Sequence, residues 1–178
     1  MTDAWTGCYD LSWKNIIADA ATSHPAKFSR GLIERIVAHA FEQGWVQPGS
    51  QIVDPFGGVA CGGIVCAYRG LRWIGVELES RFIELAHQSF ALHARHWQTL
   101  GCPQPVILQG DSRRLCALVK EAGIVVGSPP FAEMQGHVSM GHPEKFCRGG
   151  SITQHCTTGA RSGDEKFGYT PGQLGAMK

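Results

Sequence analysis

The chain has 178 residues, a formal net charge of +1 and a hydrophobic fraction of 43%. Its length is that of one ordinary domain with its own core, and its composition is globular rather than disordered. No apolar run approaches the roughly 18 residues of a membrane span. The first residues, MTDAWTGCYDL, lack the basic and apolar regions of a signal peptide. We therefore expect a cytoplasmic protein that does not contact a membrane.

Glycine is unevenly distributed along the chain. Nine of the 23 glycines fall in residues 132–178, which are also poor in long apolar runs. This asymmetry predicts a compact front, residues 1–131, followed by a loop-like tail, residues 132–178.

The seven cysteines include no CxxC pair, which favours reduced thiols over a disulfide framework. His137, His142 and Cys147 follow one another at intervals of five residues. This spacing matches no zinc-finger pattern, so we expect polar loop residues here and no metal site.

Strands and helices are predicted to alternate along the front of the chain. Apolar residues at helical spacing fill the two longest helical segments, and short apolar runs between them end in polar or turn residues. The predicted elements are a helix over 29–44, a strand over 51–54, a helix ending at Gly70, a strand over 72–77, a helix over 80–100, a strand over 105–109, a short helix, and a strand over 124–126. This order predicts an α/β fold with a doubly wound, Rossmann-like, mostly parallel sheet.

All four predicted strands end in a residue suited to ligand binding. In doubly wound sheets, ligands lie beyond the carboxyl ends of the strands, where the strand order reverses. The residues at these ends are Asp54, Glu77, Asp111 and Ser128. Their common position predicts a site at this edge of the sheet.

The loop after the first strand, residues 54–63, is rich in glycine, which lets the backbone approach a ligand closely. Glu77 at the end of the second strand can accept two hydrogen bonds from ribose hydroxyls. The sequence has no GxxxxGK[ST] phosphate loop. The pattern therefore favours a nucleoside ligand without a phosphate chain.

The tetrapeptide Ser128-Pro129-Pro130-Phe131 follows the last predicted strand. Its two prolines fix the backbone and remove two amide donors, which leaves carbonyls free to accept hydrogen bonds from an amino group. The ring of Phe131 offers a face on which a base can stack. A rigid turn is the alternative interpretation, but the position beside the other strand ends favours a functional one.

Residues 20–131 resemble the S-adenosylmethionine-dependent DNA amino-methyltransferases, which methylate cytosine N4 or adenine N6. Asp54-Pro55-Phe56-Gly57-Gly58 is similar to the DPFxG cofactor motif of that family, and Ser128-Pro129-Pro130-Phe131 is similar to its [DNS]PP[YFW] catalytic motif. His24-Pro25-Ala26-Lys27-Phe28 resembles the upstream cofactor segment. Residues 74–79 and 110–112 resemble the second- and third-strand segments.

The resemblance implies S-adenosylmethionine as cofactor and DNA as partner. It implies that the motif from Asp54 to Gly58 lines the cofactor pocket and that Glu77 holds the ribose. Asp111 would approach the adenine, and Lys27 and Phe28 would lie near the methionine end. One position departs from the family pattern, because Ala60 stands where the family usually has glycine.

The reaction implied by the resemblance is direct methyl transfer to the amine of a base flipped out of the duplex. Hydrogen bonds from the amine to the Ser128 side chain and the Pro129 carbonyl would favour a tetrahedral nitrogen, with Phe131 stacked on the base. No metal or covalent nucleophile is required. Serine at the first motif position favours cytosine N4 over adenine N6.

Several alternatives stay open. The substrate could be an RNA base or a protein glutamine amide, or the chain could be an inactive remnant or one half of a split enzyme. Family members usually continue with three more strands, so the later strands are expected to be missing and the chain truncated at its C-terminus. The 124–126 strand would then be an exposed edge, which a second copy or a complementing chain could cover. Basic residues of the tail either contact phosphates or belong to a solvated loop.

Overall fold

The computed structural model describes residues 4–24 and 27–129. They belong to the first of the two units into which the chain divides, Met1–Pro129. Several predicted features lie outside the described residues. These are the boundary at 131/132, the tail with its histidines, Cys147 and basic residues, and Pro130 and Phe131.

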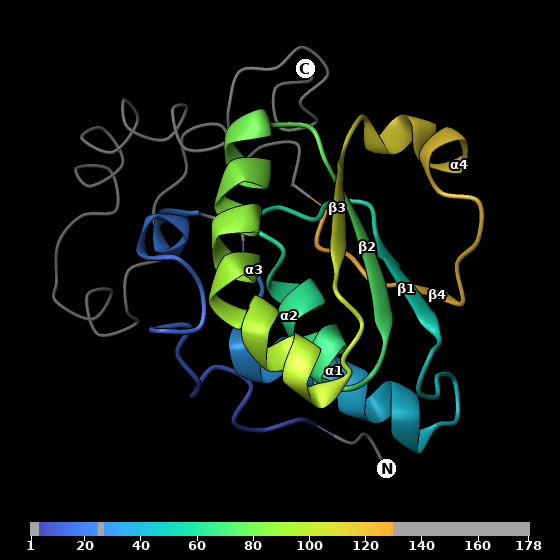
Figure 1. Ribbon diagram of the computed structural model, residues 1–178. Coiled ribbons are helices and arrows are strands. Elements are labelled where there is room, and N and C mark those ends of the chain that lie inside the picture. The colour runs from blue at the N-terminus through green and yellow to red at the C-terminus, as the bar shows by residue number, and fades with distance from the viewer. Residues whose placement is uncertain (1–3, 25–26, 130–178) are drawn as a thin grey trace, which may run out of the picture. The chain divides into compact units, whose positions relative to one another are not determined.

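The described residues contain one sheet of four parallel strands, in the order β3-β2-β1-β4 (Figure 1). The strands are β1, Gln51–Asp54; β2, Arg72–Glu77; β3, Val106–Gln109; and β4, Ile124–Val125. The predicted α/β fold with a Rossmann-like sheet is confirmed. Each strand lies within a residue or so of its predicted range.

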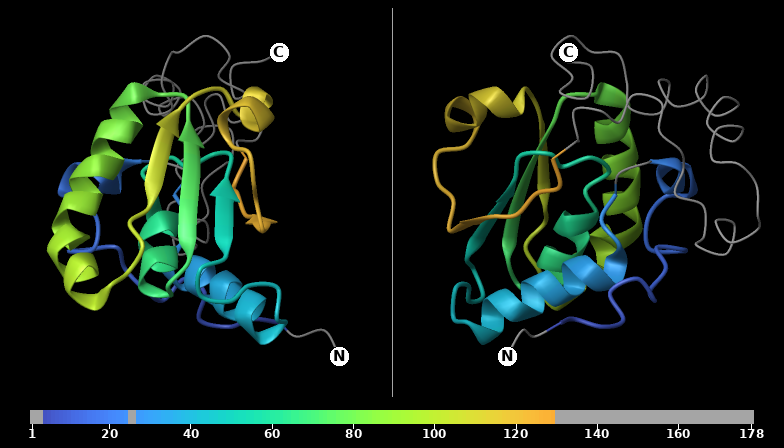
Figure 2. Two further views of the ribbon diagram at one scale, coloured as in Figure 1. Left: turned by 45° about the vertical axis from the view of Figure 1, so that its right-hand side comes forward. Right: turned by 180° about the vertical axis from the view of Figure 1, so that it is seen from behind.

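Three helices lie on one side of this sheet and the short helix α4 lies on the other (Figure 2). The helices are α1, Arg30–Glu42; α2, Cys61–Tyr68; α3, Ser80–Leu100; and α4, Leu115–Leu118. Two 3-10 helices accompany them: η1, Asp19–Ser23, and η2, Ser112–Arg114. The sequence pattern did not predict η1.

The main core lies between the sheet and the helices α1 to α3. Helix α2 is buried from Cys61 to Ala67, as expected for a helix that is apolar all round. It lies close to the indole of Trp73 on β2, where a Cβ added to Gly63 would come within 2.8 Å of the ring. Glycine at this position therefore permits the close packing of α2 on the sheet.

The strand order reverses at β1. The chain steps from β1 to β2 to β3 in one direction and then returns to place β4 on the other side of β1. The carboxyl end of β1 is therefore the topological switch point, where doubly wound folds bind their ligands.

The two outer strands of the described sheet carry exposed apolar side chains, with Val125 on β4 54% exposed and Val106 on β3 46% exposed. The predicted exposure of the fourth strand is thus seen in this part of the chain. No helix among the described residues is long and apolar enough to cross a membrane.

Candidate functional site

The loop after β1 is held by its own carboxylate. Asp54 is only 3% exposed, and its Oδ1 accepts a hydrogen bond from the amide of Phe56 at 2.9 Å. The amide of Gly57 donates to the carbonyl of Val76 at 2.8 Å, which ties the loop to the end of β2. A Cβ on Gly57 would lie 3.2 Å from the Cα of Gly75, so the loop crosses β2 too closely for a larger residue.

Two residues of this loop adopt the left-handed conformation, Gly58 with φ of 53° and Ala60 with φ of 60°. Ala60 is the residue at which the sequence departs from the glycine of the family motif. Its backbone has the conformation that glycine favours, so the shape of the loop is kept despite the substitution. An alanine in this region carries on the order of 1 kcal/mol of backbone strain.

Glu77, at the end of β2, braces the same loop. One carboxylate oxygen accepts the amide of Gly58 and the other accepts the amide of Glu79, each at 2.9 Å. Burial raises the pKa of Glu77, against the opposing effect of these hydrogen bonds. The carboxylate therefore stabilises the loop through hydrogen bonds to its backbone. Glu77 is not among the residues that line the hollow over this loop.

A solvent-open hollow lies over the loop and joins three segments that are far apart in the sequence. Its lining residues are His24, Lys27, Phe28, Asp54, Phe56, Gly57, Gly58, Val59, Cys61, Gly62 and Ser128. Most of the predicted site residues in the described part of the chain are thus brought together. Pro55, Glu77, Asp111 and Pro129 are outside this lining.

Ser128 reaches the hollow because the chain passes directly over Asp54 after β4. The amide of Val126 continues the pairing with β1 by donating to the Val53 carbonyl at 2.9 Å. A Cβ on Gly127 would lie 3.1 Å from the Asp54 carboxylate, so the backbone runs close to it. The first residue of the predicted catalytic tetrapeptide therefore lies beside the predicted cofactor loop.

The upstream segment forms another wall of the hollow. The ring of His24 is 8% exposed and stands edge-on to Phe82, with 4.2 Å between ring centroids. A Cβ on Gly58 would be 3.3 Å from this ring. The Lys27 Nζ donates to the carbonyls of Thr22 and His24 at 2.8 and 2.9 Å, so the ammonium caps the end of η1.

Burial sets the charge state of the hollow. It raises the pKa of Asp54 to about 7, with a smaller contribution from the Glu77 charge, and raises that of the Cys61 thiol to about 12. Burial, with the nearby charges of Lys27 and Arg81, lowers the pKa of His24 to about 4. At neutral pH the imidazole and the thiol are therefore neutral, and Asp54 is poised between its two forms.

Asp111 has different surroundings. Its carboxylate accepts hydrogen bonds from the backbone amide and the guanidinium of Arg113, and these contacts lower its pKa to about 2. In this arrangement the side chain serves as the N-cap of η2.

No individual roles were predicted from the sequence for His24, Val59, Cys61, Gly62 or Gly127. A signal existed for His24, which opens the upstream motif one turn before Lys27. The glycine before the tetrapeptide also offered a signal, since close passage of a backbone requires it. Nothing in the pattern distinguished Val59 or Cys61 from ordinary core residues.

Known proteins are similar to the first half of this chain. Residues 1–88 match the protein family described as DNA methylase. The chain is also similar to the type II methyltransferase M2.DpnII of Streptococcus pneumoniae, with 31% identity over 88 residues. That stretch makes up 49% of this chain and 30% of the relative's length. The stretch that matches the DNA methylase family includes the upstream segment, the loop after β1 and Glu77.

Proposed function

We propose that this chain transfers a methyl group from S-adenosylmethionine to the exocyclic amine of a DNA base, cytosine N4 in preference to adenine N6. The observation that carries the proposal is the hollow at the end of β1, where the cofactor loop and Ser128 share one lining. The match of residues 1–88 to the DNA methylase family and the similarity of this stretch to a type II methyltransferase support it.

The chemistry of the hollow fits S-adenosylmethionine. The carboxylate of Asp54 can balance the positive charge of the α-ammonium group, and the backbone at Gly57 and Gly58 carries no side chain that would fill the hollow. Glu77 lies outside the lining of the hollow, and its oxygens each accept one amide and retain a lone pair that we assign to a ribose hydroxyl. We assign Asp111 to the adenine as a weak contact, because its carboxylate is shared with Arg113.

S-adenosylmethionine supplies an electrophilic methyl carbon on a positively charged sulfur. The chain's own task is to hold the amine in line with it. The Ser128 hydroxyl and the Pro129 carbonyl would accept the two N–H groups, which directs the nitrogen lone pair toward the methyl group, and Phe131 would stack on the base. Positioning of this kind can remove several kcal/mol, roughly 7–11 in the best cases, from a bimolecular barrier.

The Cys61 thiol has no covalent role in this proposal. A thiolate is the reactive form of cysteine, and burial that raises the pKa to about 12 leaves almost none of it at neutral pH. Cys66, with a pKa raised to about 12 by the same cause, is equally unsuited to attack a substrate.

The second candidate function is a cofactor-binding chain that needs a second polypeptide or a second copy for activity. The observation that favours it is the edge strand β4, where Val125 is 54% exposed beside the switch point. In this case S-adenosylmethionine would bind, but the chain alone would methylate nothing.

Calorimetric titration with S-adenosylmethionine, followed by transfer of labelled methyl groups to unmodified DNA, separates these candidates. We expect binding, transfer to DNA and N4-methylcytosine on nucleoside analysis. RNA and glutamine-containing peptides in parallel reactions test the other acceptor classes. Loss of transfer with retained cofactor binding in Ser128→Ala would support the assigned role of Ser128, whereas full activity of this variant would refute it. If the native chain does not bind the cofactor, the proposed function is wrong.

A further inference from the structure

Two polar side chains of α3, Ser89 and His93, are buried one helical turn apart. Ser89 is fully buried and His93 is 9% exposed. Both lie beyond residues 1–88, the stretch that matches the DNA methylase family. Buried polar groups are costly unless they are hydrogen-bonded, so their partners indicate what they do.

Both side chains bind the same segment, residues 12–24, which we call the amino-terminal strap. The His93 Nε2 lies 2.7 Å from the carbonyl oxygen of Ile16, and the Ser89 Oγ accepts the amide of Ala18 at 3.1 Å. Because a carbonyl oxygen can only accept, His93 carries a proton on Nε2. Its Nδ1 then accepts the Tyr68 hydroxyl at 2.8 Å, so both ring nitrogens are used.

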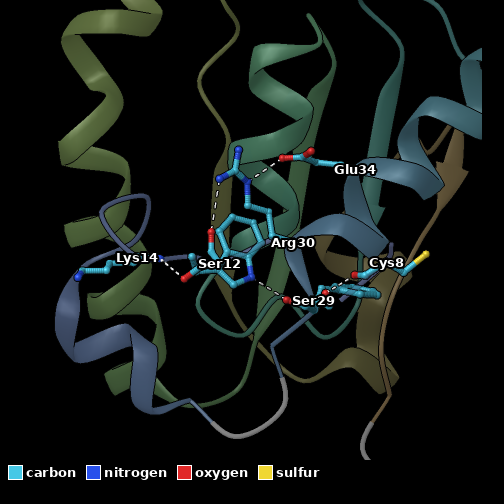
Figure 3. Close-up of polar contacts among 8 residues, drawn as sticks. Cys8, Ser12, Lys14, Ser29, Arg30 and Glu34 are labelled. Carbon is cyan, nitrogen blue, oxygen red and sulfur yellow. Dashed lines mark hydrogen bonds and ion pairs between the residues drawn. The ribbon is translucent and has the colours of Figure 1, made fainter. Parts of the chain in front are cut away.

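The other side of the strap is fastened to the start of α1. The Trp13 Nε1 donates to the carbonyl of Phe28 at 2.8 Å. Figure 3 shows Arg30 reaching the Ser12 carbonyl while it also pairs with Glu34. The strap is therefore held between α3 and the amino-terminal end of α1.

The strap ends in the wall of the hollow. Its last turn, η1, leads directly from Ala18 to His24, whose ring faces Gly58. The Lys27 ammonium is bound to two carbonyls of this turn. A displacement of the strap at Ile16 or Ala18 would therefore move two residues that line the hollow.

We propose that Ser89 and His93 are positioning residues for the cofactor. By holding the amino-terminal strap against α3, they place His24 and Lys27 in the wall of the hollow before the cofactor binds. A wall ordered in advance does not have to lose conformational entropy on binding, which strengthens affinity. This inference rests on the proposed function, since it assigns the residues to S-adenosylmethionine binding.

The two nitrogens of His93 allow a matched pair of variants. His93→Gln puts an amide nitrogen near the position of Nε2 and can still donate to Ile16, whereas His93→Asn reaches only the position of Nδ1. Both lose the stacking of the ring on Trp97 equally. Tyr68→Phe is a further control, because it removes the outer hydrogen bond and leaves the strap contact.

The first measurement is the Kd of S-adenosylmethionine for the full chain, by calorimetry. We expect His93→Asn to bind about tenfold more weakly than the native chain, and His93→Gln and Tyr68→Phe to remain within about threefold of it. His93→Asn should unfold at a somewhat lower temperature than His93→Gln, because the Ile16 carbonyl loses its donor. The Kd values are therefore compared at a temperature where both variants are fully folded, and a difference in affinity under these conditions is what a purely structural role would not produce.

The second measurement is amide hydrogen exchange of residues 13–24 without cofactor. Faster exchange in His93→Asn, with native rates in His93→Gln, would support the inference. Equal affinities and equal exchange of the two variants, beside a native chain that binds the cofactor, would overturn the positioning role alone. A native chain that does not bind S-adenosylmethionine would instead overturn the proposed function, and the positioning role with it.

Discussion

The carboxylates at the ends of β1 and β2 differ sharply from the one that follows β3. Asp54 and Glu77 are bound by backbone amides of the loop that they support, and burial raises the pKa of both. Asp111 is held by Arg113, and the pKa of its carboxyl is lowered to about 2. Asp54 is 3% exposed, whereas the Asp111 side chain is 23% exposed.

The difference follows from the position of each strand in the sheet. β1 and β2 are inner strands, whose ends are covered by the loop and by α2, whereas β3 is an outer strand of the described sheet. A carboxylate in an inner position must use nearby amides to offset its lost hydration, and an outer one can pair with an exposed arginine. An acidic residue at the end of a strand can therefore be a buried carboxyl with a raised pKa, as at Asp54 and Glu77, or a partly exposed one with a lowered pKa, as at Asp111.

Among variants of the three carboxylates, Asp54→Asn should have the largest effect on S-adenosylmethionine affinity. The asparagine oxygen can still accept the Phe56 amide, but the negative charge of the hollow is lost. We expect S-adenosylmethionine affinity to fall by about a hundredfold, since a buried charge partner is removed. Calorimetry gives the affinity, and an unchanged Kd would show that Asp54 does not face the cofactor.

The same variant should be more stable than the native chain when no cofactor is present. At pH 8 the native protein holds an ionised carboxylate in a buried position, and the amide avoids that cost. We expect a gain on the order of 2 kcal/mol in the free energy of unfolding, measured by urea denaturation at pH 8. At pH 4, where Asp54 is protonated in the folded state, the gain should vanish.

Glu77→Gln should have the second largest effect on S-adenosylmethionine affinity. The carboxylate accepts two amides and glutamine has one acceptor oxygen, so either Gly58 or Glu79 loses its partner. Leaving one buried amide unpaired costs about 1–3 kcal/mol of stability. We expect the Kd to rise by about tenfold because the loop shifts and a ribose acceptor is lost. Retained affinity together with retained stability would contradict the bracing role.

The pH dependence of cofactor binding should reveal Asp54 without any mutation. With its pKa raised to about 7, the carboxyl is mostly protonated at pH 6 and mostly ionised at pH 8. Affinity for the positively charged cofactor should therefore rise severalfold over this interval and level off above it. Proton release on binding, measured by calorimetry in buffers of different ionisation enthalpy, gives an independent check. Asp54→Asn is the control and should show neither effect.

Stability without cofactor adds a second test of pH behaviour. The raised pKa of Asp54 means that its contribution is lost as pH rises from 3.8 to about 7, whereas the lowered pKa of His24 means that its contribution is lost as pH falls from 6.5 to about 4. The two slopes oppose each other in the native chain. In Asp54→Asn the histidine slope is opposed by the smaller slope of Glu77, whose pKa is also raised, so we expect stability to rise more steeply with pH than in the native chain between about 4 and 6.5. A slope equal to that of the native chain would contradict the raised pKa of Asp54.

Asp111→Asn should have the smallest effect on S-adenosylmethionine affinity. Its carboxylate is partly exposed and shared with Arg113, so the amide removes a weak, screened interaction. We expect S-adenosylmethionine affinity to change by less than about threefold. A loss comparable to that of Asp54→Asn would mean that Asp111 leaves Arg113 when the cofactor binds and that the two kinds of carboxylate become alike.

Much of this fold could be predicted from the sequence because its signals are local. Helical spacing in residues 80–100 and the short run Arg72–Glu77 each specify one element, and the acids that follow the strands specify the edge at which a site forms. The loop from Asp54 to Gly58 carries its own turn chemistry, and the structure brings it to Ser128 at the switch point.

The remaining features depend on contacts between distant segments. Asp111 and Asp54 both lie at the carboxyl end of a strand. Only the folded chain shows that Arg113 binds the Asp111 carboxylate. The strap contacts of Ser89 and His93 join residues more than 70 positions apart, and the helical periodicity of α3 does not predict them. Likewise, the left-handed backbone of Ala60 follows from the loop and not from a preference of alanine.

The return of the chain to β1 also has a consequence for synthesis on the ribosome. The pairing of Ile52 with Ile124 spans the greatest sequence separation of the three strand pairings, and contacts of greater separation form later because of their loop-closure entropy. A growing chain emerges from its amino terminus, so β1, β2 and β3 can assemble while β4 is still being made. The loop held by Asp54 and Glu77 can thus form first, and Ser128 reaches it only after β4 has paired with β1. Until then, the nascent protein exposes the unpaired edge of β1.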